Sequence, residues 1–388
     1  MNPDHILAAP THPDPYPFYA RLVEGPPLVY DARHKLWIAS SAAGVKAVLA
    51  HPDCHVRPAA EPVPQAIVGS AAGEVFGHLV RMNEGVRHHA PKLALQRFLA
   101  ALDLGHVQQR TESIAAQTMA QAGSVGGAGL SRWTLDVPVM TVADLLGFEA
   151  SGLGQVAGWM GDFVACLSPL SNAAQLEAAG KAAQALLARF SGLAGAAAAQ
   201  PRSALAQVQL EAVQAGWIDT HALLANLVGL LSQTYEATAG LIGNSIVALA
   251  TQSGLRQAVG LEPDRILALV QEVSRHDPSI HSTRRFVARP VEVAGEHLPA
   301  GEVILLVLAA AGRDPLCNPQ PHAFLLDRPE REVPGFGHGR HQCPGQALAC
   351  AIAASALKAL LAGDGLQALP RSWHYRPSMN ARIPVFAD

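Results

Sequence analysis

A cysteine stands in a glycine-rich stretch, residues 336–345, directly before a run of helix-forming residues. A thiolate at a helix N-terminus is stabilised by the helix dipole and by free backbone N–H groups, so we expect Cys343 to be poised to ionise. Gly337, Gly339 and Gly345 lack Cβ atoms, so the backbone here can pass close to a large flat ligand. The stretch therefore predicts a thiolate beside such a ligand.

The ten residues are Phe336, Gly337, His338, Gly339, Arg340, His341, Gln342, Cys343, Pro344 and Gly345. They resemble the haem-binding loop of the cytochrome P450 superfamily, Phe-Gly-x-Gly-x-His-x-Cys-x-Gly, at every fixed position. The resemblance implies haem b as the cofactor and Cys343 as the ligand of its iron, a bond that favours O–O cleavage. It also implies that Phe336, Gly337 and Gly345 line the haem.

Two other interpretations of this stretch remain open. The first is a structural cysteine buried in a glycine-rich loop. The second is a zinc site of His338, His341 and Cys343, for which no fourth ligand lies at a suitable spacing. The cysteines are scattered, and without a CxxC pair they indicate neither a disulfide framework nor a four-cysteine zinc site. They are Cys54, Cys166, Cys317, Cys343 and Cys350.

A second element lies 68 residues before Cys343 (343 − 275). Glu272 and Arg275 are spaced i, i+3, so their side chains can meet on one helix face. Such pairs are common on solvated surfaces, where they contribute little. In this context the pair resembles the family's Glu-x-x-Arg element, which implies structural support beneath the haem.

Haem carries two propionates, which need cationic or hydrogen-bonding partners. The resemblance implies His341 at the haem rim, Arg285 on a strand, and His88 with Lys92 as the family's early His-x-x-x-Arg pair. The chain departs from that pair, because Lys92 replaces arginine and Pro91 stands between the two residues. Arg87 and His89 are therefore alternatives to His88.

The central helical run resembles the family's oxygen-activating helix. In this register Glu236 is the distal acid, and Ala237 stands where a threonine usually supplies a hydroxyl. Thr234 replaces the usual small glycine. The missing hydroxyl should impair ordered proton transfer. Thr234 or Thr238 turning in, an ordered water, or a hydroxyl of the substrate could each replace it.

The resemblance places the substrate pocket by region. Its segments are the central helix and residues 61–76, 163–170, 278–282 and 377–381, which supply mainly apolar side chains, as small-molecule pockets do. The residues we expect there are Tyr235, Ile67, Phe163, Ile280, His281 and Met379.

The elements that must position these residues are mostly helical. We expect a hairpin over residues 28–40, helices over 42–50 and 262–276, and a long buried helix over 223–252. Helices should fill 92–190, with a break at Gly123 to Gly129, and a further helix should run from Pro344, at its first position, to Leu361. Strands are expected over Phe286–Val293 and Glu296–Val307, around turns at 294–295 and 299–301. The prediction is a mainly α protein with a minor β region in the cytochrome P450 fold. One domain spans 1–388, with haem between the long central helix and the cysteine loop.

Composition limits the partners. A net charge of −3 with no Lys/Arg block gives no indication of nucleic-acid binding. The longest apolar run, residues 303–311, is too short for a bilayer, and the N-terminus shows no signal-peptide pattern. We therefore expect a cytoplasmic protein without a membrane partner.

The function implied is a haem-thiolate monooxygenase, an oxidoreductase that inserts one oxygen atom from O2 into an apolar or amphipathic small molecule. Because the chain lacks a Gly-x-Gly-x-x-Gly fingerprint, electrons should come from a ferredoxin or flavodoxin with its reductase. The alternatives are peroxide-driven, oxidative-coupling or substrate-assisted chemistry at the same haem, and a haem-binding sensor without turnover.

Overall fold

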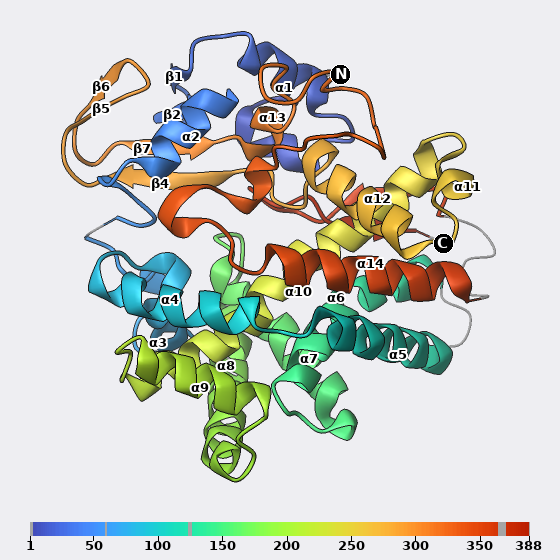
Figure 1. Ribbon diagram of the computed structural model, residues 1–388. Coiled ribbons are helices and arrows are strands. Elements are labelled where there is room, and N and C mark those ends of the chain that lie inside the picture. Colours follow the sequence, from blue (N-terminus) through green and yellow to red (C-terminus); the bar gives the residue numbers. More distant parts are fainter. Residues whose placement is uncertain (1–2, 59, 123–125, 364–369, 388) are drawn as a thin grey trace.

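A computed structural model describes residues 3–58, 60–122, 126–363 and 370–387. Helices make up most of it (Figure 1). The α-helices are α1 Tyr16–Val23, α2 Ala42–Ala50, α3 Ala71–His78, α4 Val86–Ala100, α5 Leu104–Ala122, α6 Gly127–Leu145, α7 Leu153–Phe163, α8 Ala173–Ala196, α9 Ala204–Gln214, α10 Thr220–Thr251, α11 Leu255–Val259, α12 Pro263–His276, α13 Leu308–Ala311 and α14 Gln346–Ala362. The 3-10 turns are η1 Ile6–Thr11, η2 Gln65–Ile67, η3 Val80–Met82, η4 Ala150–Gly152, η5 Val164–Leu167, η6 Ala197–Ala199, η7 Pro334–Phe336 and η8 Gly339–His341.

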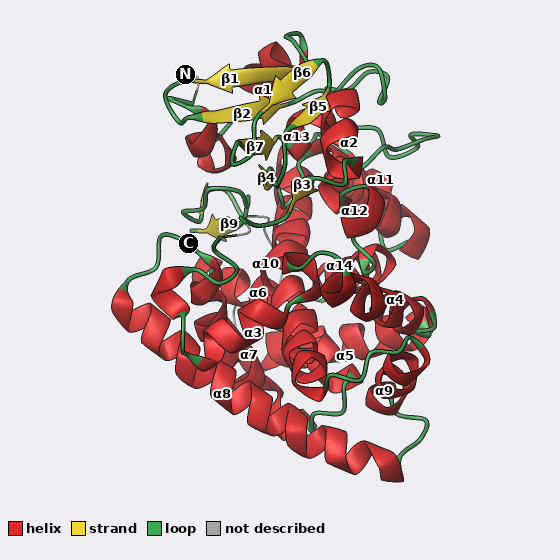
Figure 2. Cartoon of the chain, turned by 90° about the vertical axis from the view of Figure 1, so that its left-hand side faces the viewer, coloured by secondary structure: helices red, strands yellow, loops and turns green. Residues whose placement is uncertain are grey.

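Most strands gather at one end of the molecule, β9 lies midway near the C-terminus, and the long helices fill the other end (Figure 2). They are β1 Leu28–Asp31, β2 Leu36–Ala39, β3 Cys54–His55, β4 Thr283–Val287, β5 Val291–Val293, β6 Glu296–Leu298, β7 Val303–Leu306, β8 Trp373–Tyr375 and β9 Pro384–Phe386. One sheet has the order β1-β2-β7-β4-β3, and β2 runs parallel to β7 with Trp37 opposite Ile304. This sheet ties the N-terminal hairpin to the segment that follows α12.

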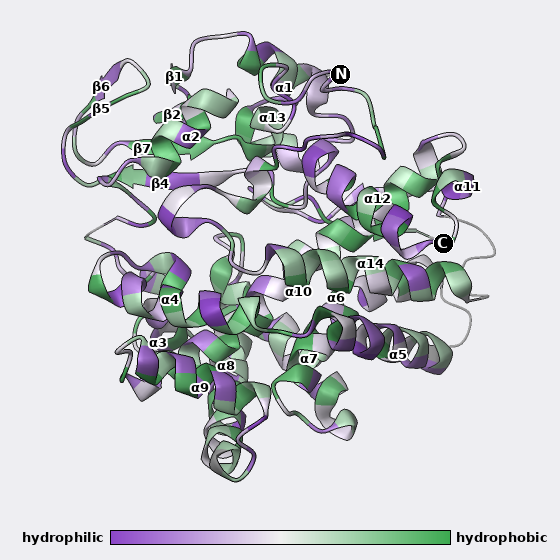
Figure 3. Cartoon of the chain, in the orientation of Figure 1, coloured by the Kyte–Doolittle hydropathy of each residue, from purple (hydrophilic) through white to green (hydrophobic). Residues whose placement is uncertain are grey.

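The helix α10 crosses the middle of the molecule and contacts α6, α12 and α14. Asp219 caps its first turn by accepting a hydrogen bond from the Ala222 N–H at 3.0 Å. Apolar side chains surround it on every side, which is typical of a buried helix. Hydrophobic residues also cover much of its neighbour α14 (Figure 3). A Cβ at Gly243 would lie 2.6 Å from Pro384 Cγ, so glycine is what lets β9 pack against α10.

The prediction of a mainly α fold with a minor β region is confirmed, including the hairpin, the helix α2, the central helix and α12. Four predicted segments differ in their boundaries. Residues 286–293 and 296–307 form shorter strands, because Pro290 cannot donate to a ladder and Pro299 begins a turn. The last helix begins at Gln346, two residues after Pro344. In the expected break, residues 123–125 lie outside the described residues, while Gly127 and Gly129 lie inside α6.

Candidate functional site

The cysteine loop is held in shape by its own backbone. The Cys343 N–H donates to the Phe336 carbonyl at 2.8 Å, which closes the loop between η7 and α14. Gly337 has a φ of 75°, a left-handed conformation that favours glycine. At Gly345, by contrast, φ is ordinary and a Cβ would meet no protein atom within 4 Å. The protein alone therefore does not require glycine at 345, which fits a ligand passing close to that position.

The thiol of Cys343 is exposed, yet it stands among protein groups that change its acidity. Burial raises the pKa of the thiol above its ordinary value, while the Gly345 backbone N–H and the Lys92 ammonium act against that rise. The Gly345 N–H therefore acts in the direction that the helix-terminus prediction expects, and burial of the thiol acts against it. A bound metal would supply the missing stabilisation of the thiolate.

Four nitrogen-bearing side chains converge beside this loop from α4, η8 and β4. His88 and His341 lie with ring centroids 4.2 Å apart, and the Lys92 ammonium donates to the Gln342 carbonyl. Arg285 is buried, with one N–H bonded to the Arg284 carbonyl at 2.8 Å. The structure thus brings together His88, Lys92, Arg285 and His341. Of the alternatives, it places Arg87 and His89 on the exposed face of α4.

Several nitrogen atoms of this cluster are buried without a hydrogen-bond partner among the described residues. They are His88 Nε2, His341 Nε2 and Arg285 Nε. Burial and the nearby His341 and Lys92 charges lower the pKa of His88 to about 4, and burial lowers the pKa of Arg285 to about 10. Unpaired buried donors and desolvated cations need an anionic partner. The two carboxylates of haem b fit this donor set.

Glu84 balances part of the cluster and escaped the sequence reasoning. Its carboxylate bonds Arg340 Nε at 2.9 Å, and its Oε1 lies 3.1 Å from His341 Nε2 outside hydrogen-bonding geometry. Burial opposes its ionisation, but the contacts with His341 and Arg340 still hold the pKa of Glu84 at about 2. No motif marked Glu84, because its side-chain partners Arg340 and His341 lie more than 250 residues away.

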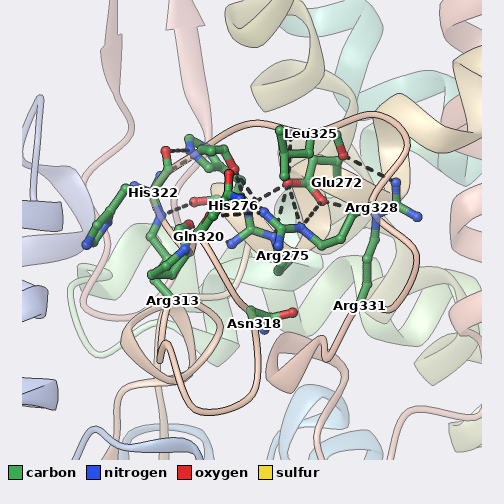
Figure 4. Close-up of polar contacts among 12 residues, drawn as sticks. Glu272, Arg275, His276, Arg313, Asn318, Gln320, His322, Leu325, Arg328 and Arg331 are labelled. Atoms are coloured by element: carbon green, nitrogen blue, oxygen red, sulfur yellow. Dashed lines mark hydrogen bonds and ion pairs between the residues drawn. The ribbon is translucent and has the colours of Figure 1, made fainter.

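The Glu-x-x-Arg pair is fully buried at the centre of a larger network (Figure 4). Glu272 Oε1 lies 2.6 Å from Arg275 Nη2 and accepts from the Leu325 N–H at 3.1 Å. Arg328 and Arg331 approach the same carboxylate at 3.2 and 3.1 Å. Burial opposes the charge, yet these donors hold the pKa of Glu272 below its ordinary value. No sequence pattern marks Arg328 and Arg331, because they lie on an irregular segment.

On the central helix, the acid and the two threonine hydroxyls have different partners. Glu236 Oε1 lies 3.4 Å from Arg376 Nη1, and burial raises the pKa of Glu236 despite Arg376 and Arg81. The Thr234 hydroxyl donates to the Leu230 carbonyl at 2.8 Å. Thr238 is buried, and its hydroxyl has no hydrogen-bond partner in the part of the chain that the structure describes. Ala237 is half-buried between them.

The predicted pocket residues fall into different environments. Tyr235, Ile67 and Phe163 belong to one hydrophobic cluster around α10. Ile280 pairs with Ala381 through a β-bridge, so two predicted pocket segments lie side by side, and Met379 stands half-buried in the second. His281, the remaining predicted pocket residue, contacts Tyr19 near the N-terminal segment.

His281 belongs to a polar cluster near the N-terminal segment. Its Nδ1 lies 3.0 Å from the Tyr19 hydroxyl and its Nε2 lies 3.6 Å from Asp277. A cavity of about 930 Å³ adjoins this cluster, with Asn244, His276 and Arg382 in its wall. Its wall includes Pro377 and part of the central helix, both from predicted pocket regions, but none of the individual residues predicted for the site.

Arg81 is a residue that the sequence reasoning missed. It lies in η3, and its charge interacts with Cys166 and Glu236, which come from two of the predicted pocket regions. Its Nε is buried without a partner among the described residues. Nothing in a lone arginine beside a short 3-10 turn marks it in the sequence.

Within the described residues, no group of three His, Cys, Asp or Glu side chains is arranged to hold a metal ion. The structure therefore gives no support to a zinc site of His338, His341 and Cys343. No helix of the described chain is long and apolar enough to cross a bilayer.

Comparison with known proteins supplies the family. The family model described as Cytochrome P450 matches residues 266–362. Cytochrome P450 144 of Mycobacterium tuberculosis (strain CDC 1551 / Oshkosh) is 30% identical over 290 residues, 73% of this chain and 66% of that protein. The 6-deoxyerythronolide B hydroxylase of Saccharopolyspora erythraea is 27% identical over 257 residues, 66% of this chain and 62% of that protein. The chain thus spans just under two thirds of the length of these relatives.

Solved structures show the same fold at lower identity. The crystal structure of CalO2 has a TM-score of 0.82 at 22% identity and covers 97% of this chain and 96% of its own. P450BioI, solved with a hexadec-9Z-enoic acid ligated acyl carrier protein, has a TM-score of 0.80 at 21% identity, with 96% of each chain covered. Cytochrome P450 proteins, whose family model matches this chain, bind haem through a cysteine ligand, so haem is the cofactor here. With its cysteine loop, buried Glu-x-x-Arg network and central helix, the chain belongs to the cytochrome P450 family.

Proposed function

We propose that this protein is a haem-thiolate monooxygenase that transfers one oxygen atom from O2 to an apolar or amphipathic small molecule. The observation that carries the proposal is the cluster of unpartnered buried donors beside Cys343 in the described chain. Relatives named as hydroxylases support it, among them the 6-deoxyerythronolide B hydroxylase and a vitamin D(3) 25-hydroxylase of Pseudonocardia autotrophica.

Each residue near the loop has a role in this proposal. Cys343 binds the iron, and a thiolate-bound haem supplies the cleavage of the O–O bond. His88, Arg285 and His341 donate hydrogen bonds to the propionates, while Lys92 adds positive charge and fixes the loop through the Gln342 carbonyl. Phe336, Gly337 and Gly345 hold the backbone against the haem. Glu272 and Arg275 keep the chain beneath it in place.

Protons reach the oxygen site through the central helix. Glu236 is held by Arg376 at the wall of the site, and its raised pKa suits a group that both takes up and releases protons. We assign the hydroxyl step to Thr238 O–H, because the Thr234 hydroxyl is engaged with the Leu230 carbonyl. Ala237 leaves room beside the oxygen site and contributes no proton.

Electrons come from a separate redox protein of the ferredoxin or flavodoxin type with its reductase, because the chain has no nicotinamide or flavin fingerprint. All five cysteines are free, which fits a reducing compartment such as the cytoplasm.

The test is reconstitution of the purified protein with haem, a ferredoxin and its reductase. We expect an absorption band typical of thiolate ligation in the reduced carbon monoxide complex. We also expect a hydroxylated product whose oxygen derives from labelled O2. Turnover with the label arriving from water, or no product with any substrate of a broad panel, would contradict the proposal.

A further inference from the structure

Arg81 offers five N–H donors for which the described residues supply no partner. Its Nε is buried and unpaired, and no group of the described chain forms a hydrogen bond or ion pair with its guanidinium. Burial is also the main reason why its pKa lies below the ordinary value. The residue as a whole is half-buried, and a partly desolvated cation without a partner is unfavourable, so such a group suits a place where it receives an anion.

The position of Arg81 indicates where that anion comes from. Its charge interacts with Cys166, after α7, and with Glu236 on α10. The turn that carries Arg81 is hydrogen-bonded to α10 through Asn226, whereas the propionate cluster comes from α4, η8 and β4. In the proposed function Arg81 therefore lies beside the central helix, on the substrate side of the haem.

The backbone that carries Arg81 is fixed in advance. Asn226 on α10 accepts from the Val80 N–H at 2.8 Å and donates to the His78 carbonyl at 2.8 Å. Asn83 donates to the Leu79 carbonyl at 2.8 Å. These hydrogen bonds fix the backbone on both sides of Arg81. A ligand that binds the guanidinium therefore costs little conformational entropy of this turn.

Glu236 is a carboxylate whose charge acts on Arg81, and it is therefore the internal candidate for the anion. It is already paired with Arg376 at 3.4 Å, and Arg81 forms no ion pair with it within the described residues. The guanidinium fork matches the two oxygens of a carboxylate and binds them bidentately.

We propose that Arg81 binds the carboxylate of the substrate, and that the substrates are amphipathic carboxylic acids whose apolar part faces the haem. This inference rests on the proposed function and names the substrate class for the same site. The apolar cluster that holds Phe163, Ile67 and Tyr235 supplies the surroundings for the hydrocarbon part.

The experiment compares acids with their methyl esters on the haem-loaded protein. Dodecanoic acid, 4-phenylbutyric acid and their methyl esters are titrated, and binding is followed by the shift of the haem optical spectrum. We expect each acid to bind at least about tenfold more tightly than its ester, as for one charge-assisted interaction. Arg81→Gln should abolish the difference by weakening the acids alone, and Arg81→Lys should retain part of it. Arg97→Gln, on the exposed face of α4, is the control and should keep the full preference.

Two results would overturn the inference. One is equal binding of acid and ester by the unaltered protein, and the other is a full acid preference in Arg81→Gln. If Arg81 only supports Glu236, Arg81→Gln would lower product per electron for acids and esters alike without changing their relative affinity. A protein without the thiolate-type haem spectrum would contradict the proposed function instead. The acid preference would then be measured by thermal stabilisation of the same variants.

Discussion

Single side chains decide three properties of this site, and the first is iron ligation. Two cysteines lie close together in sequence at the start of α14, Cys343 before the helix and Cys350 buried within it. Burial raises the pKa of Cys350 to about 12, so its thiol remains protonated and packs as a small apolar group. Cys343→Ser should therefore remove the thiolate band of the reduced carbon monoxide complex, whereas Cys350→Ser should keep it. If Cys343→Ser kept the band and Cys350→Ser lost it, the iron ligand would be Cys350 and our assignment would be wrong.

The second property at this scale is coupling of electrons to product. If Thr238 supplies the hydroxyl, Thr238→Ala should lower product per electron several-fold, since one positioned proton donor contributes about 10²-fold or more. Thr234→Ala should have little effect, because that hydroxyl serves the Leu230 carbonyl. Ala237→Thr introduces a hydroxyl beside Glu236 and should improve coupling for poor substrates. The measurement is product formed against reducing equivalents consumed, and a collapse in Thr234→Ala alone would contradict the assignment.

The third property is haem affinity, which depends on the space next to Gly345. Because a Cβ there meets no protein atom within 4 Å, Gly345→Ala should leave the stability of the haem-free protein nearly unchanged. It should weaken haem binding, since the added methyl group would enter the space assigned to the ligand. Haem dissociation measured by transfer to apomyoglobin checks this, and an unchanged rate would show that the position faces solvent instead.

At the scale of elements, the close contact of α10 with β9 depends on one missing side chain. Gly243→Ala places a Cβ 2.6 Å from Pro384 Cγ, and we expect it to destabilise the protein by about 1–3 kcal/mol. Gly158 in α7 has no heavy atom within 4 Å of its would-be Cβ, so Gly158→Ala should stabilise slightly, by up to about 1 kcal/mol. Denaturant unfolding of both variants separates a packing effect from helix propensity.

The Glu272 network ties α12 to the irregular segment after α13. Glu272→Ala leaves three arginines without their carboxylate, and we expect a loss of about 3–5 kcal/mol with little bound haem. Glu272→Gln keeps the side-chain volume but removes the charge, so its stability should lie between those of the unaltered protein and Glu272→Ala. Normal haem content and stability in Glu272→Ala would contradict the role assigned to the network.

How far the sequence predicts this fold and site follows from the range of the interactions. The cysteine loop, the Glu-x-x-Arg pair and the long helix are local patterns, so the sequence alone is enough to name their residues. Glu84, Arg328 and Arg81 act through residues distant in the chain, and no local spacing marks them. His281 shows the opposite error, because a residue placed in the pocket by its segment turns toward Tyr19 instead.

At the scale of the whole molecule, the polar cluster around His281 should contribute to the loss of stability at acid pH, alongside His88 and His276, whose pKa values burial also lowers. The cluster joins the N-terminal segment to the C-terminal one, because Arg382 donates to the Pro10 and His12 carbonyls and lies 2.9 Å from Asp277. His281 is fully buried there, facing Tyr16, Tyr19, Asp277, Arg313 and Arg382.

Burial lowers the pKa of His281 to about 4, although Asp277 acts in the other direction. The unfolded chain binds this proton at a pKa of about 6.5, so below that pH the unfolded state takes up more protons than the folded state. Stability should therefore fall as the pH drops from about 6.5 towards 4, by an amount on the order of 3 kcal/mol. Thermal unfolding between pH 7 and pH 4 checks the slope, and if residues 1–388 form one domain the transition should stay single. His281→Gln should flatten the profile and the exposed His297→Gln should not. If the slope of stability against pH were unchanged in His281→Gln, another group would be responsible for the loss of stability at acid pH.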